Sequence, residues 1–260
     1  SLAAGDIVII PHGDAHSLFA GAPSMPLVES TSGLLGPFPP TDLHPMRSGG
    51  GGSETRFICG YFACERYAER LFLAGLPGML KVSVRGDAAG QWLENSIRHL
   101  VGEAASGRPG GAVLLSKMAE ALFIETLRRH MAQLPPEQTG WLAAARDPIV
   151  GAALALLHRE PARAWTVTDL ALTVGASRSV VAERFTHLVG EPPLAYLAHW
   201  RLQLAARLLE TTKRTVIQVA GEVGYESEAA FNRAFKREFD SPPAQYRKGI
   251  AGRTAPPQAA

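Results

Sequence analysis

The feature that most constrains the fold is an internal repeat in the C-terminal part of the chain. Three positions recur 49 residues later: Thr166, Ala171 and Gly175 return as Thr215, Ala220 and Gly224. Four more recur after 50 residues: Phe185, Pro192, Pro193 and Tyr196 return as Phe235, Pro242, Pro243 and Tyr246. A repeat of this length indicates two copies of one supersecondary unit.

Each copy has the signals of two helices joined by a tight turn. Both open with a capping box, a pattern typical of a helix N-terminus: Thr166 with Asp169, and Thr215 with Gln218. Apolar residues at helical spacing follow, and Gly175 or Gly224 then supplies the left-handed backbone of the turn. Ser177 and Ser227 are expected to cap the next helix. The sequence therefore predicts two helix-turn-helix units.

The second helix of each copy separates an apolar edge from a polar one. In the second copy, Phe231, Phe235 and Phe239 form the apolar edge. The outward residues are Arg178, Ser179, Ala182 and Glu183 in the first copy, and Glu228, Ala229, Asn232, Arg233, Lys236 and Arg237 in the second. Such a stripe suits the major groove of DNA, because Asn bonds adenine edges, Arg bonds guanine edges and Lys neutralises phosphate. A lone helix with this pattern is more often a solvated surface, but the duplicated turns and caps favour DNA binding.

A helix that starts at Pro192 and Pro193 is expected to connect the two copies and to fix their spacing. Two reading helices about 34 Å apart can enter successive major grooves on one face of a duplex. The pattern thus predicts a single DNA reader with two reading helices.

Residues 148–248, above all "VIQVAGEVGYESEAAFNRAFKREFDSPPAQYRK", resemble the DNA-binding domain of the AraC/XylS family of bacterial transcription regulators. The resemblance implies sequence-specific binding to double-stranded DNA near promoters, with RNA polymerase as a partner if the protein is an activator. In one departure, Ala182 and Glu183 stand where family members often carry longer polar or basic residues. We therefore expect weak or unusual readout by the first copy.

The N-terminal part has the composition of a β-domain followed by helices. Strand-like runs at 6–11, 55–64 and 80–84 are separated by Gly- and Pro-rich stretches, of which the longest is expected to be a mobile surface loop. Helical spacing begins at Gln91 and continues through 111–134. The second of these helices is apolar on more than one side, so we expect it to mediate a homodimer as well as to cover the sheet.

A cupin-type pattern is recognisable at the start of the chain. Gly5, Pro11, Gly13 and His16 have the spacing of the second cupin motif, and this part is similar to the cupin-like sensor domain of one AraC-family branch. The resemblance implies a β-barrel that binds a small-molecule effector. The first cupin motif, with its paired histidines and glutamate, does not occur in these 260 residues, and the start without Met leaves open that upstream strands are missing.

Four residues of this part form a candidate metal set: His12, His16, Cys59 and Cys64. Two imidazoles and two thiolates are ligands that tetrahedral Zn²⁺ accepts. The alternative is equally open, because histidines in turns are often solvated or bonded to the backbone, and buried cysteines behave as small hydrophobes.

The expected fold class is α+β with two domains. A cupin-like domain with C-terminal helices is expected over 1–134, a linker over 135–147, an all-α double helix-turn-helix domain over 148–250 and a flexible tail over 251–260. The expected function is transcription regulation without enzymatic activity. The alternative is a cupin metalloenzyme, an oxygenase or isomerase, fused to a DNA-binding domain.

Composition adds few constraints. The balance of 26 basic and 24 acidic residues gives a net charge of only +2, so a nucleic-acid partner must be inferred from local pattern. Two cysteines cannot build a disulfide framework, which agrees with a reducing, cytoplasmic compartment. No apolar run approaches the roughly 18 residues that would indicate a membrane span.

Overall fold

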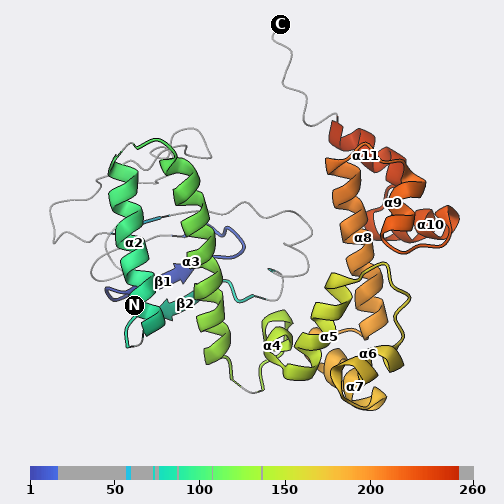
Figure 1. Ribbon diagram of the computed structural model, residues 1–260, viewed down its shortest axis with the longest axis horizontal. Coiled ribbons are helices and arrows are strands. Elements are labelled where there is room, and N and C mark those ends of the chain that lie inside the picture. Colours follow the sequence, from blue (N-terminus) through green and yellow to red (C-terminus); the bar gives the residue numbers. More distant parts are fainter. Residues whose placement is uncertain are drawn as a thin grey trace, which may run out of the picture. The chain divides into compact units, whose positions relative to one another are not determined.

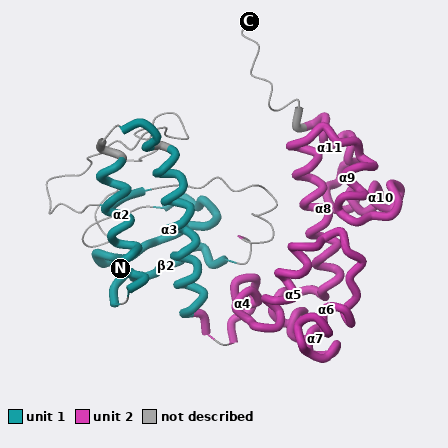
Figure 2. Tube along the Cα trace, in the orientation of Figure 1, with its two compact units in different colours: residues 1–63, 76–133 teal, residues 64–75, 134–260 magenta. Residues whose placement is uncertain are grey.

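The computed structural model of the chain, drawn in Figure 1, describes residues 1–16, 57–59, 73, 76–86, 88–106, 108–135 and 137–251. The chain divides into two compact units (Figure 2). Unit 1 contains the described residues of 1–63 and 76–133, and unit 2 contains those of 64–75 and 134–260.

Unit 1 combines a two-stranded antiparallel sheet with a helical pair. Strand β1 (Asp6–Ile9) pairs with β2 (Leu80–Ser83), so that Ile7 lies opposite Val82. Helices α2 (Ala88–Ser106) and α3 (Gly111–Gln133) pack against each other, and α3 also contacts β2. The helices thus cover the sheet, as the sequence predicts.

The core of unit 1 lies between β2 and the two helices. Val84, Leu93 and Leu122 are buried together, with Ile7 packed against them. A Cβ added to Gly90 would lie 1.8 Å from the carbonyl oxygen of Val84, so only glycine allows α2 to lie this close to the end of β2. The guanidinium of α3's Arg129 donates a hydrogen bond to the Ser83 carbonyl at 2.7 Å.

The predicted strands at 6–11 and 80–84 and both predicted helices of this unit are confirmed. Of the third expected strand, only residues 57–59 are described, and they have no regular structure. The rest of that run and the long Gly- and Pro-rich loop lie outside the described residues. The sheet of the described residues is therefore smaller than the barrel that the sequence led us to expect.

All regular elements in the described residues of unit 2 are helices. Its elements are α4 (Trp141–Arg146), α5 (Pro148–Arg159), α6 (Val167–Val174), α7 (Arg178–Val189), α8 (Pro193–Thr211), α9 (Val216–Glu222), α10 (Glu228–Phe239) and α11 (Pro243–Ala251). Helix α8 contacts α7 and also α9, α10 and α11 (Figure 1). Two helix-turn-helix units, α6–α7 and α9–α10, are thus joined by one long helix.

The local signals of the repeat are confirmed in detail. Both capping boxes form, at Thr166 with Asp169 and at Thr215 with Gln218. Gly175 and Gly224 have left-handed φ angles of 70° and 88°, and the Ser177 and Ser227 side chains cap α7 and α10. Each copy has its own apolar core, around Phe185 in the first and around Phe231 and Phe235 in the second.

The stretch 135–147, expected to be a linker, contains helix α4, so this expectation needs correction. Leu142, Ala143 and Ala144 are buried, and α4 packs on α5 and α7. Asp147 then caps α5 by accepting from the amides of Ile149 and Val150. A six-residue helix between the breakers Gly140 and Pro148 is too short to give a periodic pattern, which is why the sequence did not reveal it.

In the described part of the chain, no helix has both the length and the apolar character that crossing a bilayer requires.

Candidate nucleic-acid interface

Helix α10 is fixed to the body of unit 2 by an aromatic cluster. Phe231 and Phe235 are completely buried, with ring centroids 5.5 Å apart. Their neighbours are Tyr225, whose ring lies 5.3 Å from that of Phe231, and Phe239, whose ring lies 4.5 Å from that of Phe235. Packed aromatic side chains hold a helix in one rotational setting. The opposite edge of α10 is therefore presented to solvent in a defined orientation.

That opposite edge carries the predicted reading residues of the second copy. Glu228, Ala229, Arg233, Lys236 and Arg237 are exposed. Asn232 is half-buried beside them. One acidic and three basic side chains give this stripe a net charge of +2, from three positive charges and one negative charge. The stripe offers donors and positive charge on a rigid helix, which is what base and phosphate recognition requires.

A shallow groove of about 330 Å³ borders the reading stripe. Its lining residues are Val216, Glu228, Asn232, Arg233, Lys236, Pro242, Pro243 and Ala244. The apolar members come from the starts of α9 and α11, and the polar ones from α10. Sequence reasoning did not find the apolar part of this groove, although the duplicated Pro-Pro pair marks the place.

In the first copy, α7 presents a different surface. Arg178, Ser179 and Glu183 are exposed, and Ala182 is half-buried. Arg178 and Glu183 cancel in charge, so this stripe is neutral where that of α10 is positive. Val180, an exposed apolar residue outside the predicted stripe, lies on the same helix. Val180 corresponds to the half-buried Ala230 of the second copy, so the repeat did not mark it as an outward residue.

The candidate metal residues are only partly described. His12 Nε2 lies 3.0 Å from the Leu76 carbonyl, and His16 Nδ1 lies 3.0 Å from the Asp14 carbonyl. Cys59 is exposed, and Cys64 lies outside the described residues. Within the part that is described, no three His, Cys, Asp or Glu side chains gather closely enough to hold a metal ion.

Comparisons with known proteins match both parts of the chain. Residues 1–132 match a family model described as cupin, and residues 170–249 match one described as a helix-turn-helix domain. An AraC-like transcription regulator of Streptomyces lividans is 40% identical over 202 residues, which cover 76% of this chain and 65% of the relative. The chain thus spans slightly less than two thirds of that relative's length.

Two further matches come from a second relative and from a solved structure. The HTH-type transcriptional regulator AlkR of Acinetobacter baylyi is 34% identical over 246 residues, which cover 94% of this chain and 79% of the relative. The DNA-binding domain of AdpA, solved with a target DNA, is 34% identical and has a TM-score of 0.40, with coverage of 44% of this chain and 99% of that domain.

Proposed function

The chain belongs to the family of AraC-like transcription regulators, and on this premise we propose that it regulates transcription by binding specific double-stranded DNA through α7 and α10. The observation that carries the proposal is the stripe of half-buried Asn232 with exposed Arg233 and Lys236 on an α10 held by buried aromatic rings. Because bacterial DNA is cytoplasmic, this proposal places the protein in the cytoplasm.

The chemistry of the stripe assigns a role to each of these side chains. Arg233 can donate two parallel hydrogen bonds to a guanine edge, and Asn232 can bond an adenine edge. Lys236 and Arg237 supply positive charge for the phosphates that flank the groove. The apolar part of the groove beside them offers a surface for a sugar or a thymine methyl group.

The two reading helices contribute unequally in this proposal. The neutral stripe of α7 has Arg178 and Ser179 as donors, while Val180 and Ala182 can contact thymine methyl groups. We therefore assign most of the base discrimination and electrostatic attraction to α10, with α7 adding a weaker second contact one helical turn away.

Selection of bound sequences from random DNA with the full chain tests this proposal. Arg233→Ala and Asn232→Ala should each weaken binding to the selected site by about 1–3 kcal/mol and relax preference at one base position. Glu183→Ala changes the position that corresponds to Arg233 in the first copy, and it should leave affinity unchanged or raise it. If Arg233→Ala and the tail variant Arg253→Ala behaved alike across the library, the α10 stripe would not be the reader.

A metalloenzyme is not supported as the alternative. The reported relatives are named as transcription regulators, and neither the sequence nor the described residues contain the paired histidines and glutamate of the first cupin motif. We propose that the cupin domain instead binds a small-molecule effector and mediates a homodimer through α3. If the protein is an activator, RNA polymerase is a further partner.

We also propose that His12, His16, Cys59 and Cys64 bind one Zn²⁺. The hydrogen bonds of the two histidines support this, because each ring uses one nitrogen for a backbone carbonyl and has the other to offer. A metal-binding histidine usually bonds a carbonyl or carboxylate in this way. Four protein ligands would close the coordination shell, so such a site would stabilise the fold rather than catalyse a reaction.

A further inference from the structure

The turn of the second helix-turn-helix unit touches the loop that leads into the first, and there backbone meets backbone. A Cβ added to Gly224, in the turn of the second copy, would lie 2.7 Å from both the Cα and the carbonyl oxygen of Ala162. Ala162 belongs to the loop between α5 and α6, at the entrance to the first copy. No side chain fits at Gly224, so the turn and the loop are in direct contact.

One guanidinium group joins the same two segments. Arg201, in the middle of α8, donates from Nε to the Pro161 carbonyl at 2.6 Å and from one terminal nitrogen to the Arg163 carbonyl at 2.8 Å. Its other terminal nitrogen donates to the Gly224 carbonyl at 3.2 Å. Because the five N–H groups of a guanidinium lie in one rigid plane, these bonds fix the loop and the turn relative to each other.

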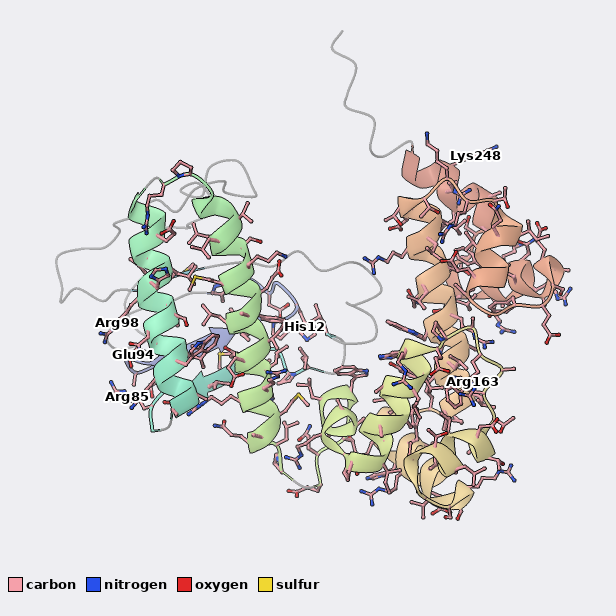
Figure 3. The ribbon with its side chains drawn as sticks, in the orientation of Figure 1. His12, Arg85, Glu94, Arg98, Arg163 and Lys248 are labelled. Atoms are coloured by element: carbon pink, nitrogen blue, oxygen red, sulfur yellow. The ribbon has the colours of Figure 1, made fainter. Side chains whose placement is uncertain are left out.

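The loop that Arg201 holds is itself anchored in the first core. The indole nitrogen of buried Trp165 donates to the Glu160 carbonyl at 3.0 Å, and the Arg163 amide donates to the same oxygen at 3.2 Å. The Arg163 side chain, which is labelled in Figure 3, lies over the Trp165 ring, and its guanidinium carbon is 3.8 Å from the ring centroid. A displacement of the loop would therefore disturb the core that positions α7.

The contact lies where α8 passes from one core to the other. Leu197 is buried in the first core and Leu202 in the second, so Arg201 occupies the junction between them. The side-chain bonds of Arg201 join the two copies at this junction in addition to the continuous helix, and so restrict bending and twisting of α8 there.

We propose that Arg201 and Gly224 form an inter-unit clamp that sets the distance and rotation between α7 and α10, and thereby the spacing of the two DNA half-sites that the protein accepts. The proposal rests on the DNA-binding function proposed above. One inserted base pair moves a half-site by about 3.4 Å and rotates it by about 35°. A rigid clamp makes the protein sensitive to such a change, whereas a loose junction would adapt to it.

The repeat supplies a matched control for the clamp. Gly175, the corresponding turn glycine of the first copy, is also left-handed, with φ 70°, but an added Cβ there would meet nothing within 4 Å. Gly175→Ala and Gly224→Ala therefore impose similar backbone strain, and only Gly224→Ala also separates the turn from the loop.

The first experiment measures the clamp without DNA. Spin labels at Leu172→Cys in α6 and Ile217→Cys in α9, which are 76% and 60% exposed, report the distance between the copies in the full chain. Cys59→Ser and Cys64→Ser are present in every sample so that the labels attach only at the two chosen positions, and any effect of losing these thiols is common to all the distributions compared. We expect a narrow distance distribution that broadens in Arg201→Met, which keeps the aliphatic stem and loses the donors. Distributions of equal width would overturn the proposal.

The second experiment varies the DNA. A selected site with one base pair inserted or removed between its half-sites should bind the parent protein at least about tenfold more weakly. The loss should shrink to about threefold or less in Arg201→Met and Gly224→Ala, and stay at the parent value in Gly175→Ala. Arg201→Lys, with a point charge in place of the planar fork, should lie between.

The possible outcomes distinguish failure of the clamp proposal from failure of the DNA-binding proposal. If the parent binds no DNA but the label distances broaden in Arg201→Met, the clamp stands and the DNA-binding proposal fails. If Arg201→Met does not fold, the comparison of Gly224→Ala with Gly175→Ala decides. An equal spacing preference in these two variants would contradict the clamp.

Discussion

The hydroxyl oxygen of Tyr196 in α8 lies 2.7 Å from Nε2 of His158 in α5. Trp141 of α4 donates its indole N–H to the same hydroxyl at 3.3 Å, and the His158 ring stacks on Trp200 with centroids 4.3 Å apart. Helices α4, α5 and α8, which surround the first core, are thus joined through the hydroxyl of the buried Tyr196. Burial lowers the pKa of His158 to about 4 and raises that of Tyr196 to about 12.

The first prediction concerns acid stability. Between pH 6.5 and pH 4, His158 is protonated in the unfolded chain but not in the folded chain. Near pH 7 this group therefore does not reduce the free energy of unfolding, which falls as the pH drops through this window. The expected loss is about 2–3 kcal/mol. Denaturant titrations at several pH values should give a smaller loss for His158→Gln. The exposed His187→Gln on α7 is the control, and an equal pH slope in both variants would contradict the prediction.

The second prediction concerns salt. Lys236→Ala on α10 should reduce the slope of log affinity against log salt concentration by about one, because one phosphate contact fewer releases one counterion fewer. Fluorescence anisotropy with a selected site at four salt concentrations measures this. Lys117→Ala in α3, where the lysine is paired with Glu120, should leave the slope unchanged. Equal slopes of log affinity against log salt concentration for Lys236→Ala and the parent would show that Lys236 does not contact a phosphate.

The third prediction compares two glycines of α2. Gly90→Ala would place a methyl group 1.8 Å from the Val84 carbonyl, so α2 must move from the sheet, at a cost of about 2–4 kcal/mol to unit 1. Gly102→Ala meets nothing within 4 Å and should raise stability by about 0.5–1 kcal/mol through its higher helix propensity. Thermal unfolding followed by circular dichroism should show opposite shifts, and shifts of one sign would contradict the packing.

The fourth prediction tests the homodimer through α3. Leu114 and Ile124 are 41% and 50% exposed, so Leu114→Glu and Ile124→Glu should convert a micromolar dimer to monomer without unfolding it. Leu122 of the same helix lies in the core at 9% exposed, and Leu122→Glu should unfold unit 1 instead. Sedimentation velocity checks both, and a monomeric parent would end the dimer proposal.

The fifth prediction concerns the zinc proposal. Protein purified without a histidine tag should contain about one Zn²⁺ per chain, and Cys59→Ser or Cys64→Ser should lose it. A chelator should lower the melting temperature of unit 1 and leave that of unit 2 unchanged. Metal affinity should decrease as the pH is lowered, because the cysteines bind the metal as deprotonated thiolates. Metal-free protein with an unaltered melting curve would contradict the zinc proposal.

The sequence by itself determined the repeat and everything local that the repeat encodes. Capping boxes at Thr166 and Thr215 and the turn at Gly175 depend on a few adjacent residues, so short-range hydrogen bonding and backbone sterics specify them. The apolar and cationic edges of α10 follow in the same way from helical periodicity. These signals were sufficient for the double reader and for its family.

Only the tertiary structure decided what depends on contacts between distant segments. Gly224 and Gly175 are equivalent in the sequence repeat, yet only Gly224 meets the backbone of Ala162, 62 positions earlier. In the sequence, Arg201 is one more charged residue on an amphipathic helix. The structure shows that it bonds three backbone carbonyls from two other segments. Leu122 and Leu114 have the same side chain, and only packing against β2 and α2 buries one and exposes the other. Burial and long-range hydrogen bonding are properties of the assembled chain, and no local pattern encodes them.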